Sequence, residues 1–212
     1  PHQEPVVAIR SLAIFCASSD GADPAFIESA RQVGRSLAHR GIAVVYGGGR
    51  IGLMGAVADG ALGAGGRVIG VIPRAMVQAE RAHTGVSDLR IVDSMHERKA
   101  LMADLADGFI ALPGGYGTFD ELFEIITWGQ LAIHVKPVGI LNVRNFYGPL
   151  LAFLDATTAA GFIQPRFRAM LQAADTLEDL LDRFGRYIPP SGGGFARPAE
   201  APASLPPPPT PR

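Results

Sequence analysis

Short apolar runs alternate along the chain with longer stretches in which apolar residues recur every three or four positions. The short runs predict strands at residues 12–16, 42–46, 67–72, 89–92, 108–112 and 138–141. The longer stretches predict helices at residues 24–41, 55–64, 94–105, 118–128, 147–160 and 176–187. Strands and helices that alternate at this spacing form βαβ units. We therefore predict an α/β fold in a single domain, a Rossmann-like doubly wound parallel sheet with helices on both faces.

The two ends of the chain lack this pattern. We expect a flexible N-terminal segment at residues 1–9, the folded domain at residues 10–189, and a disordered tail rich in proline and glycine at residues 190–212. Residues 1–5 do not resemble a signal peptide. Arg or Asp interrupts every long apolar run, so we expect no membrane-spanning segment.

Composition limits the kinds of partner. The chain has 212 residues, of which 48% are hydrophobic and 18% charged, with a formal net charge of −1. This balance is typical of a globular protein and offers no broad basic surface for nucleic acid, so any phosphate site must be local. The single cysteine, Cys16, excludes an internal disulfide framework and fits a cytoplasmic protein.

The most informative stretch is Pro113-Gly114-Gly115-Tyr116-Gly117-Thr118-Phe119-Asp120-Glu121, which follows an apolar strand and precedes a helix. Its three glycines allow a sharp turn and a close approach of the backbone to a ligand. The first N–H groups of a helix have no partner within the helix, and the helix dipole favours an anion there. The motif therefore predicts a phosphate site at the helix start, with Glu121 beside it.

A second interpretation of these residues needs no ligand. Thr118-x-x-Glu121 matches a capping box, in which Thr118 caps the helix and Glu121 bonds back. A cap contributes about 1 kcal/mol to stability by itself. A cap does not require three glycines, however, and a phosphate cradle does. The glycines therefore favour the phosphate site.

A second glycine motif, Gly47-x-Gly49-x-x-Gly52, also follows a predicted strand and precedes a helix. The spacing matches the dinucleotide-binding fingerprint, which further needs an acidic residue about 20 residues later to hold a ribose hydroxyl. The next strand is followed by Arg74 instead, so NAD is disfavoured and NADP remains a weaker alternative. A nucleoside monophosphate held by one or both glycine turns fits better, while close packing of helix and strand explains Gly52 and Gly55.

Together the two motifs resemble those of the LOG ("Lonely Guy") family of cytokinin riboside 5'-monophosphate phosphoribohydrolases, over about residues 12–188. The resemblance implies hydrolysis of the N-glycosidic bond of cytokinin riboside 5'-monophosphates, AMP or both, to free base and ribose 5-phosphate. It implies neither a metal nor an organic cofactor. It also implies a homodimer whose sites lie near the subunit interface.

The resemblance assigns roles to individual residues. Cleavage of a glycosidic bond develops positive charge on the sugar, so a carboxylate is needed nearby, and Glu121 is the candidate. The family's catalytic arginine falls on Arg98. The adjacent cations Arg98 and Lys99 at a helix start suggest a nearby anion, although two solvated surface charges remain the alternative. The expected substrate contacts are Ser18, Gly48, Gly49, Glu80, Met95, Lys99, Gly114, Gly115, Tyr116, Gly117, Thr118, Asp120 and Thr127.

Other chemistries find less support. The histidines are dispersed without metal-ligand spacing, so we expect no metal site. The family is often labelled as lysine decarboxylase, but Lys99 and Lys136 have no setting that suits a cofactor-binding lysine. The main alternative is a non-catalytic carrier of related fold that binds a nucleotide or the molybdenum cofactor. The presence of both Arg98 and Glu121 favours the enzyme.

Overall fold

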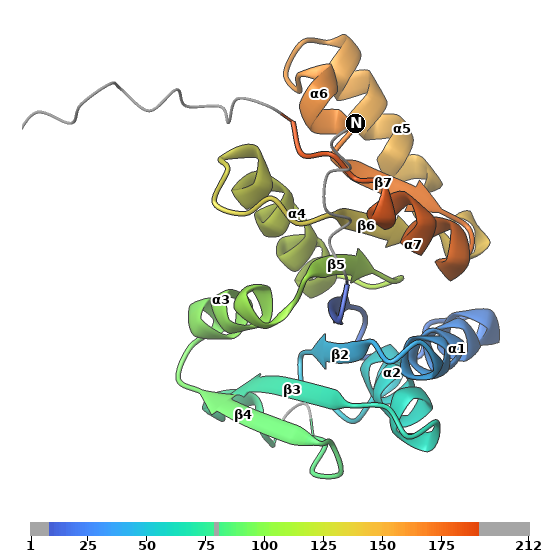
Figure 1. The fold of residues 1–212 in the computed structure, drawn as a ribbon, viewed down its shortest axis with the longest axis vertical. Coiled ribbons are helices and arrows are strands. Elements are labelled where there is room, and N and C mark those ends of the chain that lie inside the picture. The colour runs from blue at the N-terminus through green and yellow to red at the C-terminus, as the bar shows by residue number, and fades with distance from the viewer. Residues whose placement is uncertain (1–8, 79–80, 191–212) are drawn as a thin grey trace, which may run out of the picture.

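The structure, a computed structural model, describes residues 9–78 and 81–190. Within these residues the strands form one seven-stranded parallel sheet in the order β4-β3-β2-β1-β5-β6-β7 (Figure 1). The strands are β1 (Ser11–Phe15), β2 (Ala43–Tyr46), β3 (Val68–Pro73), β4 (Asp88–Val92), β5 (Gly108–Ala111), β6 (Val138–Leu141) and β7 (Leu171–Ala174). The prediction of a doubly wound α/β fold is confirmed. The predicted flexible segment and tail fall almost entirely outside the described residues and stay predictions.

Helices cover both faces of the sheet (Figure 1). They are α1 (Pro24–His39), α2 (Gly52–Gly63), α3 (Met95–Leu105), α4 (Tyr116–Gln130), α5 (Gly148–Ala159), α6 (Pro165–Arg168) and α7 (Leu177–Gly185), with short 3-10 helices η1 (Arg74–Met76) and η2 (Val143–Asn145). Helices α1, α2 and α7 pack on one face, and α3, α4 and α5 on the other. None of the helices in the described part of the chain is long and apolar enough to cross a membrane.

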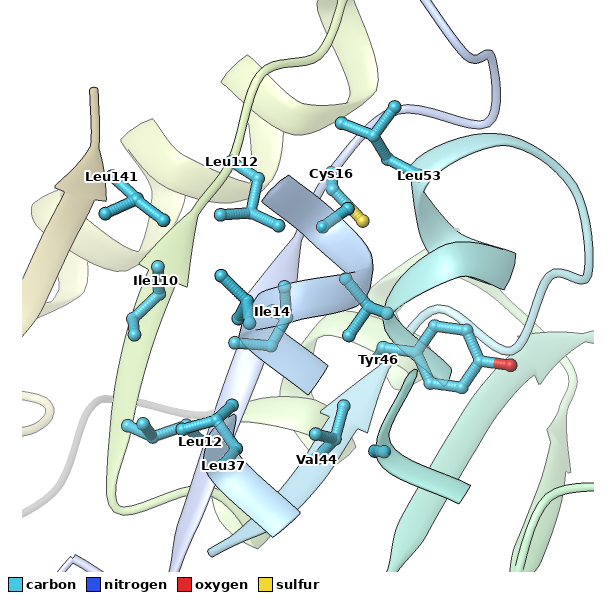
Figure 2. Close-up of a cluster of buried hydrophobic side chains, with 14 of the residues drawn as sticks. Leu12, Ile14, Cys16, Leu37, Val44, Tyr46, Leu53, Ile110, Leu112 and Leu141 are labelled. Carbon is cyan, nitrogen blue, oxygen red and sulfur yellow. The ribbon is translucent and has the colours of Figure 1, made fainter. Parts of the chain in front are cut away.

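The core consists of two apolar clusters separated by the sheet. Leu12, Ile14 and Cys16 point from the β1 segment toward α1 and α2, beside Ile110 and Leu112 of the β5 segment (Figure 2). The residues between them, such as Ala13 and Phe15, belong to the opposite cluster. Because successive side chains of a strand point to opposite faces, a strand covered on both sides must be apolar throughout. This requirement explains the continuous apolar runs in the sequence.

The strand order fixes where a ligand can bind. Chain segments β1 to β4 extend the sheet in one direction, and β5 to β7 extend it in the other. The loops after β1 and β5 therefore leave the sheet in opposite directions and open a crevice at its carboxyl edge. The Pro113–Glu121 motif begins directly after β5, so the topology places it at this crevice.

The structure corrects two details of the predicted elements. Helix α4 begins at Tyr116 rather than at Thr118, with Gly115 as its N-cap. Strand β7 and the short helix α6 were missed. The β7 sequence, Leu-Gln-Ala-Ala, has no β-branched or aromatic residue and lacks the signal by which a strand is recognised.

Two glycines let α1 and α2 approach each other closely. A Cβ atom added at Gly34 would lie 2.0 Å from the carbonyl oxygen of Val57, and one at Gly60 would lie 2.1 Å from that of Arg31. Both distances are far below a normal contact, and the obstructing atoms are backbone. Side chains larger than hydrogen at these positions would push the two helices apart.

We therefore expect Gly60→Ala to lower the free energy of unfolding by about 1–3 kcal/mol, the usual cost of overpacking. Gly63→Ala is the matched control, because it lies in the same helix and its added Cβ would meet nothing within 4 Å. That substitution should be neutral or stabilising by up to about 1 kcal/mol, since alanine is the better helix former. Urea unfolding of the two variants measures the difference, and equal midpoints would contradict the close packing.

Candidate active site

A pocket of about 280 Å3 lies at the carboxyl ends of β1 and β5. The loop after β1 contributes Ala17, Ser18 and Ser19, and the turn after β5 contributes residues 115–118. The remaining lining residues are Ile14, Cys16, Gly47, Met54, Met76, Met95, Arg98 and Glu121. The pocket therefore sits at the switch point of the sheet, where the topology leads one to expect a ligand.

Backbone hydrogen bonds hold the loop after β1 in place. The N–H of Ala17 donates to the carbonyl of Pro113 at 3.2 Å, which ties this loop to the central motif. On the other side, Met54 N donates to Ala17 O at 3.1 Å and Leu53 N to Ser19 O at 3.3 Å. These bonds occupy N–H groups in the first turn of α2. The helix that follows the second glycine motif thus donates these N–H groups to the loop after β1. They are not available to bind a phosphate.

The first turn of α4 is different. Its N-cap is Gly115, and no side chain within the described residues caps it. A Cβ atom added at Gly115 or Gly117 would meet nothing within 4 Å, so these glycines border open space. A Cβ at Gly114 would lie 2.1 Å from Thr118 Oγ1, so that glycine serves close packing. The start of α4 is therefore an uncapped helix N-terminus that borders the pocket.

The alternative interpretation of Thr118 and Glu121 as a capping box is wrong. Thr118 is the third residue of α4, is buried and lines the pocket, and the helix has no side-chain cap bond. The turn of Gly114 and Gly115 lets the chain enter the helix two residues earlier than the polar pattern indicated. Both residues therefore line the pocket instead of capping the helix.

Arg98 is buried, with 4% of its surface exposed, so the interpretation as a solvated surface charge is wrong. It lies in the first turns of α3, whose start is capped by Ser94 Oγ accepting from Glu97 N at 3.1 Å. Arg98 Nη2 donates to the carbonyl of Gly47 at 3.1 Å. A Cβ at Gly47 would lie 1.8 Å from Nη2, so only glycine leaves room for this guanidinium.

Glu121 approaches the same space from α4 and is 9% exposed. The charges of Glu121 and Arg98 both affect the pKa of the nearby Cys16 thiol. Its pKa is raised above its usual range, first by burial and then by the negative charge of Glu121, while the positive charge of Arg98 acts in the opposite direction. A cation and a carboxylate thus border one pocket beside an uncapped helix start. This arrangement can hold an anionic ligand and stabilise positive charge that develops on it.

Lys99 does not line the pocket. Its Nζ lies 3.0 Å from Asp120 Oδ2 and 3.0 Å from Glu124 Oε2, both on α4. Burial opposes the charge of Lys99, but the contacts with Glu124 and Asp120 outweigh it and raise the pKa of the ammonium group. The sequence predicts an anion near Arg98 and Lys99. For Lys99 this anion is the pair of carboxylates of Asp120 and Glu124. These ion pairs fasten α3 to α4 and so hold Arg98 opposite Glu121.

The other expected contacts that the structure describes fall into three groups. Ser18, Met95, Gly115, Tyr116, Gly117 and Thr118 line the pocket. Asp120 and Thr127 lie instead in a second hollow on the outer side of α4, here called the outer hollow, which is lined by Tyr116, Phe119, Asp120, Phe123, Glu124, Thr127 and Trp128. Gly48 and Gly49 are buried outside the pocket lining, where Gly48 O accepts from His83 N at 2.9 Å. Glu80 lies outside the described residues.

Sequence reasoning missed part of the pocket wall. Met54, Met76, Cys16 and Ser19 line it without belonging to any predicted contact. Met76 comes from η1, a connection with no motif, and only the folded chain brings it to Arg98. No group of three or more His, Cys, Asp or Glu residues in residues 9–78 and 81–190 is arranged to hold a metal ion.

The model of a protein family described as "Possible lysine decarboxylase" matches residues 54–184. Curated relatives of this chain carry the LOG name. One is "Probable cytokinin riboside 5'-monophosphate phosphoribohydrolase LOGL5" of Oryza sativa subsp. japonica, 49% identical over 181 residues, which cover 85% of this chain and 74% of the relative. The chain belongs to the LOG family.

Two further relatives support the assignment. Cytokinin riboside 5'-monophosphate phosphoribohydrolase LOG of Oryza sativa subsp. japonica is 47% identical, with 85% of this chain and 74% of the relative covered. LOG3 of Arabidopsis thaliana, of the same activity name, is 46% identical, with 85% of this chain and 84% of the relative covered. The resemblance drawn from the two glycine motifs is confirmed.

Solved structures share the fold at lower identity. The molybdenum cofactor binding protein from Rippkaea orientalis has a TM-score of 0.60 at 20% identity, covering 83% of this chain and 95% of that one. The Moco carrier protein from Chlamydomonas reinhardtii has a TM-score of 0.60 at 19% identity, covering 82% and 98%. These likenesses show that LOG proteins and cofactor carriers share an architecture.

The glycines of the α4 turn provide a test of the phosphate cradle. Gly117→Ala should leave stability unchanged or slightly higher, because its Cβ meets no protein atom and alanine favours the helix. The added methyl group would nevertheless project into the space where the phosphate is expected to approach the helix N–H groups. AMP binding should therefore weaken by roughly tenfold or more, the effect of losing one charge-assisted hydrogen bond. Titration calorimetry measures the affinity. Gly185→Ala, in α7 and also facing open space, is the control that should bind AMP normally.

Proposed function

We propose that this LOG-family chain hydrolyses the N-glycosidic bond of cytokinin riboside 5'-monophosphates and releases free base and ribose 5-phosphate. The observation that carries the proposal is that Arg98 and Glu121 border one pocket beside the uncapped start of α4. The activity named for relatives 46–49% identical needs the same three elements. These are an anion site, a cation that orients the nucleotide and a carboxylate.

Each element has a physical role in the reaction. The N–H groups at the start of α4 bind the 5'-phosphate and fix the position of the sugar. As the bond from C1' to the base nitrogen breaks, positive charge develops on the sugar, and the Glu121 carboxylate stabilises it. Water then attacks C1' and loses a proton, while the base nitrogen gains one. Arg98 binds the nucleotide and keeps the anomeric carbon beside Glu121.

The walls of the pocket bear on the choice of base. Three thioether side chains, Met54, Met76 and Met95, line it. Methionine is apolar and flexible, so such a wall can accept either a bare adenine or one that carries an apolar N6 substituent. We propose both AMP and N6-prenylated AMP as substrates.

We also propose a cytoplasmic homodimer whose sites lie near the subunit interface. Tyr116 is 93% exposed and borders both the pocket and the outer hollow, whose wall also includes Phe123 and Trp128. Large exposed aromatic residues beside a polar site are typical of an interface. A second copy packed there would lie next to the pocket mouth. Sedimentation equilibrium that gives the mass of one chain would contradict the dimer.

The proposed reaction predicts a requirement for the 5'-phosphate. The protein should release free base from AMP and from isopentenyladenosine 5'-monophosphate, and should cleave adenosine much more slowly, because the nucleoside leaves the α4 cradle empty. Chromatography of the released base measures both rates. Equal rates for AMP and adenosine would mean that the cradle does not bind the phosphate. Tight binding of AMP without any release of base would favour the non-catalytic carrier.

Glu121→Gln tests the carboxylate. Glutamine keeps the size of the side chain but removes the charge, so turnover of AMP should fall by roughly 100-fold or more, the scale for one positioned electrostatic group. The melting temperature and AMP binding should change little. Glu28→Gln, on α1 and outside the pocket, is the control for the loss of one carboxylate and should retain most of the activity. A folded and fully active Glu121→Gln enzyme would falsify this mechanism.

A further inference from the structure

The guanidinium of Arg98 lies next to two thioether sulfurs. Its Nη1 is 3.8 Å from Met95 Sδ and 3.9 Å from Met76 Sδ, while Nη2 donates to Gly47 O. A thioether sulfur is a weak hydrogen-bond acceptor. A thioether therefore competes only weakly with the oxygen acceptors of a nucleotide for a guanidinium N–H group.

The same two methionines are the most accessible ones in the chain. Met95 is 39% exposed and Met76 is partly exposed. Met54, Met102 and Met170 are buried at 5%, 1% and 2% exposure. Both accessible sulfurs border the substrate pocket, so any path that admits a nucleotide also admits a smaller molecule such as hydrogen peroxide.

We propose that Met95 and Met76 form a peroxide modification site, and that their oxidation to methionine sulfoxide blocks nucleotide binding at Arg98. The sulfur lone pair attacks one oxygen of hydrogen peroxide, an S–O bond forms, and the O–O bond breaks. The departing hydroxide takes the remaining proton and leaves as water. Sulfur loses two electrons and the peroxide gains them, so no further reactant is required.

The new oxygen acts where the substrate would bind. It is bonded to a sulfur that already lies beside Nη1, and a sulfoxide oxygen is a far better acceptor than a thioether. The sulfoxide therefore holds Nη1 by a hydrogen bond to a charged donor and competes with the nucleotide for it. It also makes a previously apolar part of the wall polar and larger. Both effects lower affinity for the substrate.

The only cysteine is a poor target for the same oxidant. Cys16 is buried, and burial raises the pKa of its thiol, with the charge of Glu121 adding to the effect. Peroxide reacts with the thiolate, which is therefore scarce at neutral pH. Peroxide sensitivity of this pocket thus depends on thioethers rather than on a thiol, and methionine sulfoxide reductases can reverse it.

The experiment titrates the full chain with hydrogen peroxide and follows three quantities. Peptide mass spectrometry should find sulfoxide at Met95 and Met76 before Met54, Met102 and Met170. AMP affinity and kcat/KM should fall in step with it, by roughly tenfold or more, the scale of one hydrogen bond to a charged group. Treatment with methionine sulfoxide reductases A and B together, which act on the two epimers, should restore both quantities.

Variants separate this site from general damage, each being compared with its own untreated activity and AMP affinity. The double variant Met76→Leu, Met95→Leu should keep its starting values at the peroxide dose that inactivates the natural sequence. Met170→Leu and Cys16→Ala should remain as sensitive as the natural sequence. Met95→Gln, whose amide oxygen imitates the sulfoxide, should bind AMP more weakly than Met95→Leu without any peroxide.

The outcomes distinguish this proposal from the proposed function on which it rests. Sulfoxide at Met95 and Met76 with unchanged AMP affinity, or equal loss in the double leucine variant, would overturn the modification site alone. An untreated protein that neither binds nor cleaves nucleoside monophosphates would contradict the proposed function, and the modification proposal with it. Normal hydrolysis of AMP that resists peroxide would leave the function standing and remove the modification site.

Discussion

The pocket depends on the placement of one buried guanidinium. A charged group with 4% exposure must find polar partners within the protein, and Arg98 finds one in the carbonyl of Gly47. That contact requires a glycine at position 47, because a side chain there would occupy the space of Nη2. The contact between Arg98 and Gly47 also requires the start of α3 to lie beside the pocket. The loop after β2, the start of α3 and the pocket wall are thus fixed together by a single cation.

Two glycine motifs that look alike in the sequence do different things in the fold. In the motif after β2, the helix start donates to the loop after β1, through Leu53 and Met54. In the motif after β5, no side chain caps the helix start, and Gly115 and Gly117 border open space. In both motifs the glycines allow another group to come close to the backbone. At the first motif that group is the loop after β1. At the second motif the space beside the backbone opens into the pocket.

The fold was predictable because burial on both faces imposes a simple pattern on parallel strands. Ser18, Arg98 and Glu121 lie together at the carboxyl edge because each follows a strand of the parallel sheet. The exception, β7, lies at the edge of the sheet, where fewer apolar contacts are required of its sequence. Along the site, a local motif points to two glycines that line the pocket, Gly115 and Gly117. Local patterns do not place side chains whose partners are distant in sequence.

Lys99 and Met76 illustrate this limit. Lys99 follows Arg98 directly, yet one side chain enters the pocket while the other pairs with Asp120 and Glu124, more than 20 residues away. Met76 belongs to η1, which carries no motif, and the fold alone brings it to the pocket lining. Neither outcome depends on residues nearby in the chain. Both depend on the packing of elements that a local pattern cannot describe.

The positions of the lysines also bear on the description of the family as possible lysine decarboxylases. Amino-acid decarboxylation through pyridoxal phosphate needs a lysine amine free to form a Schiff base with the cofactor. Lys99 Nζ is held between two carboxylates, which raise its pKa and so disfavour the neutral amine. Lys136 Nζ donates to the carbonyl of Ala103 at 2.7 Å. Neither lysine lines the pocket, whereas Arg98 and Glu121 do, and these two groups suit the hydrolysis of a nucleotide.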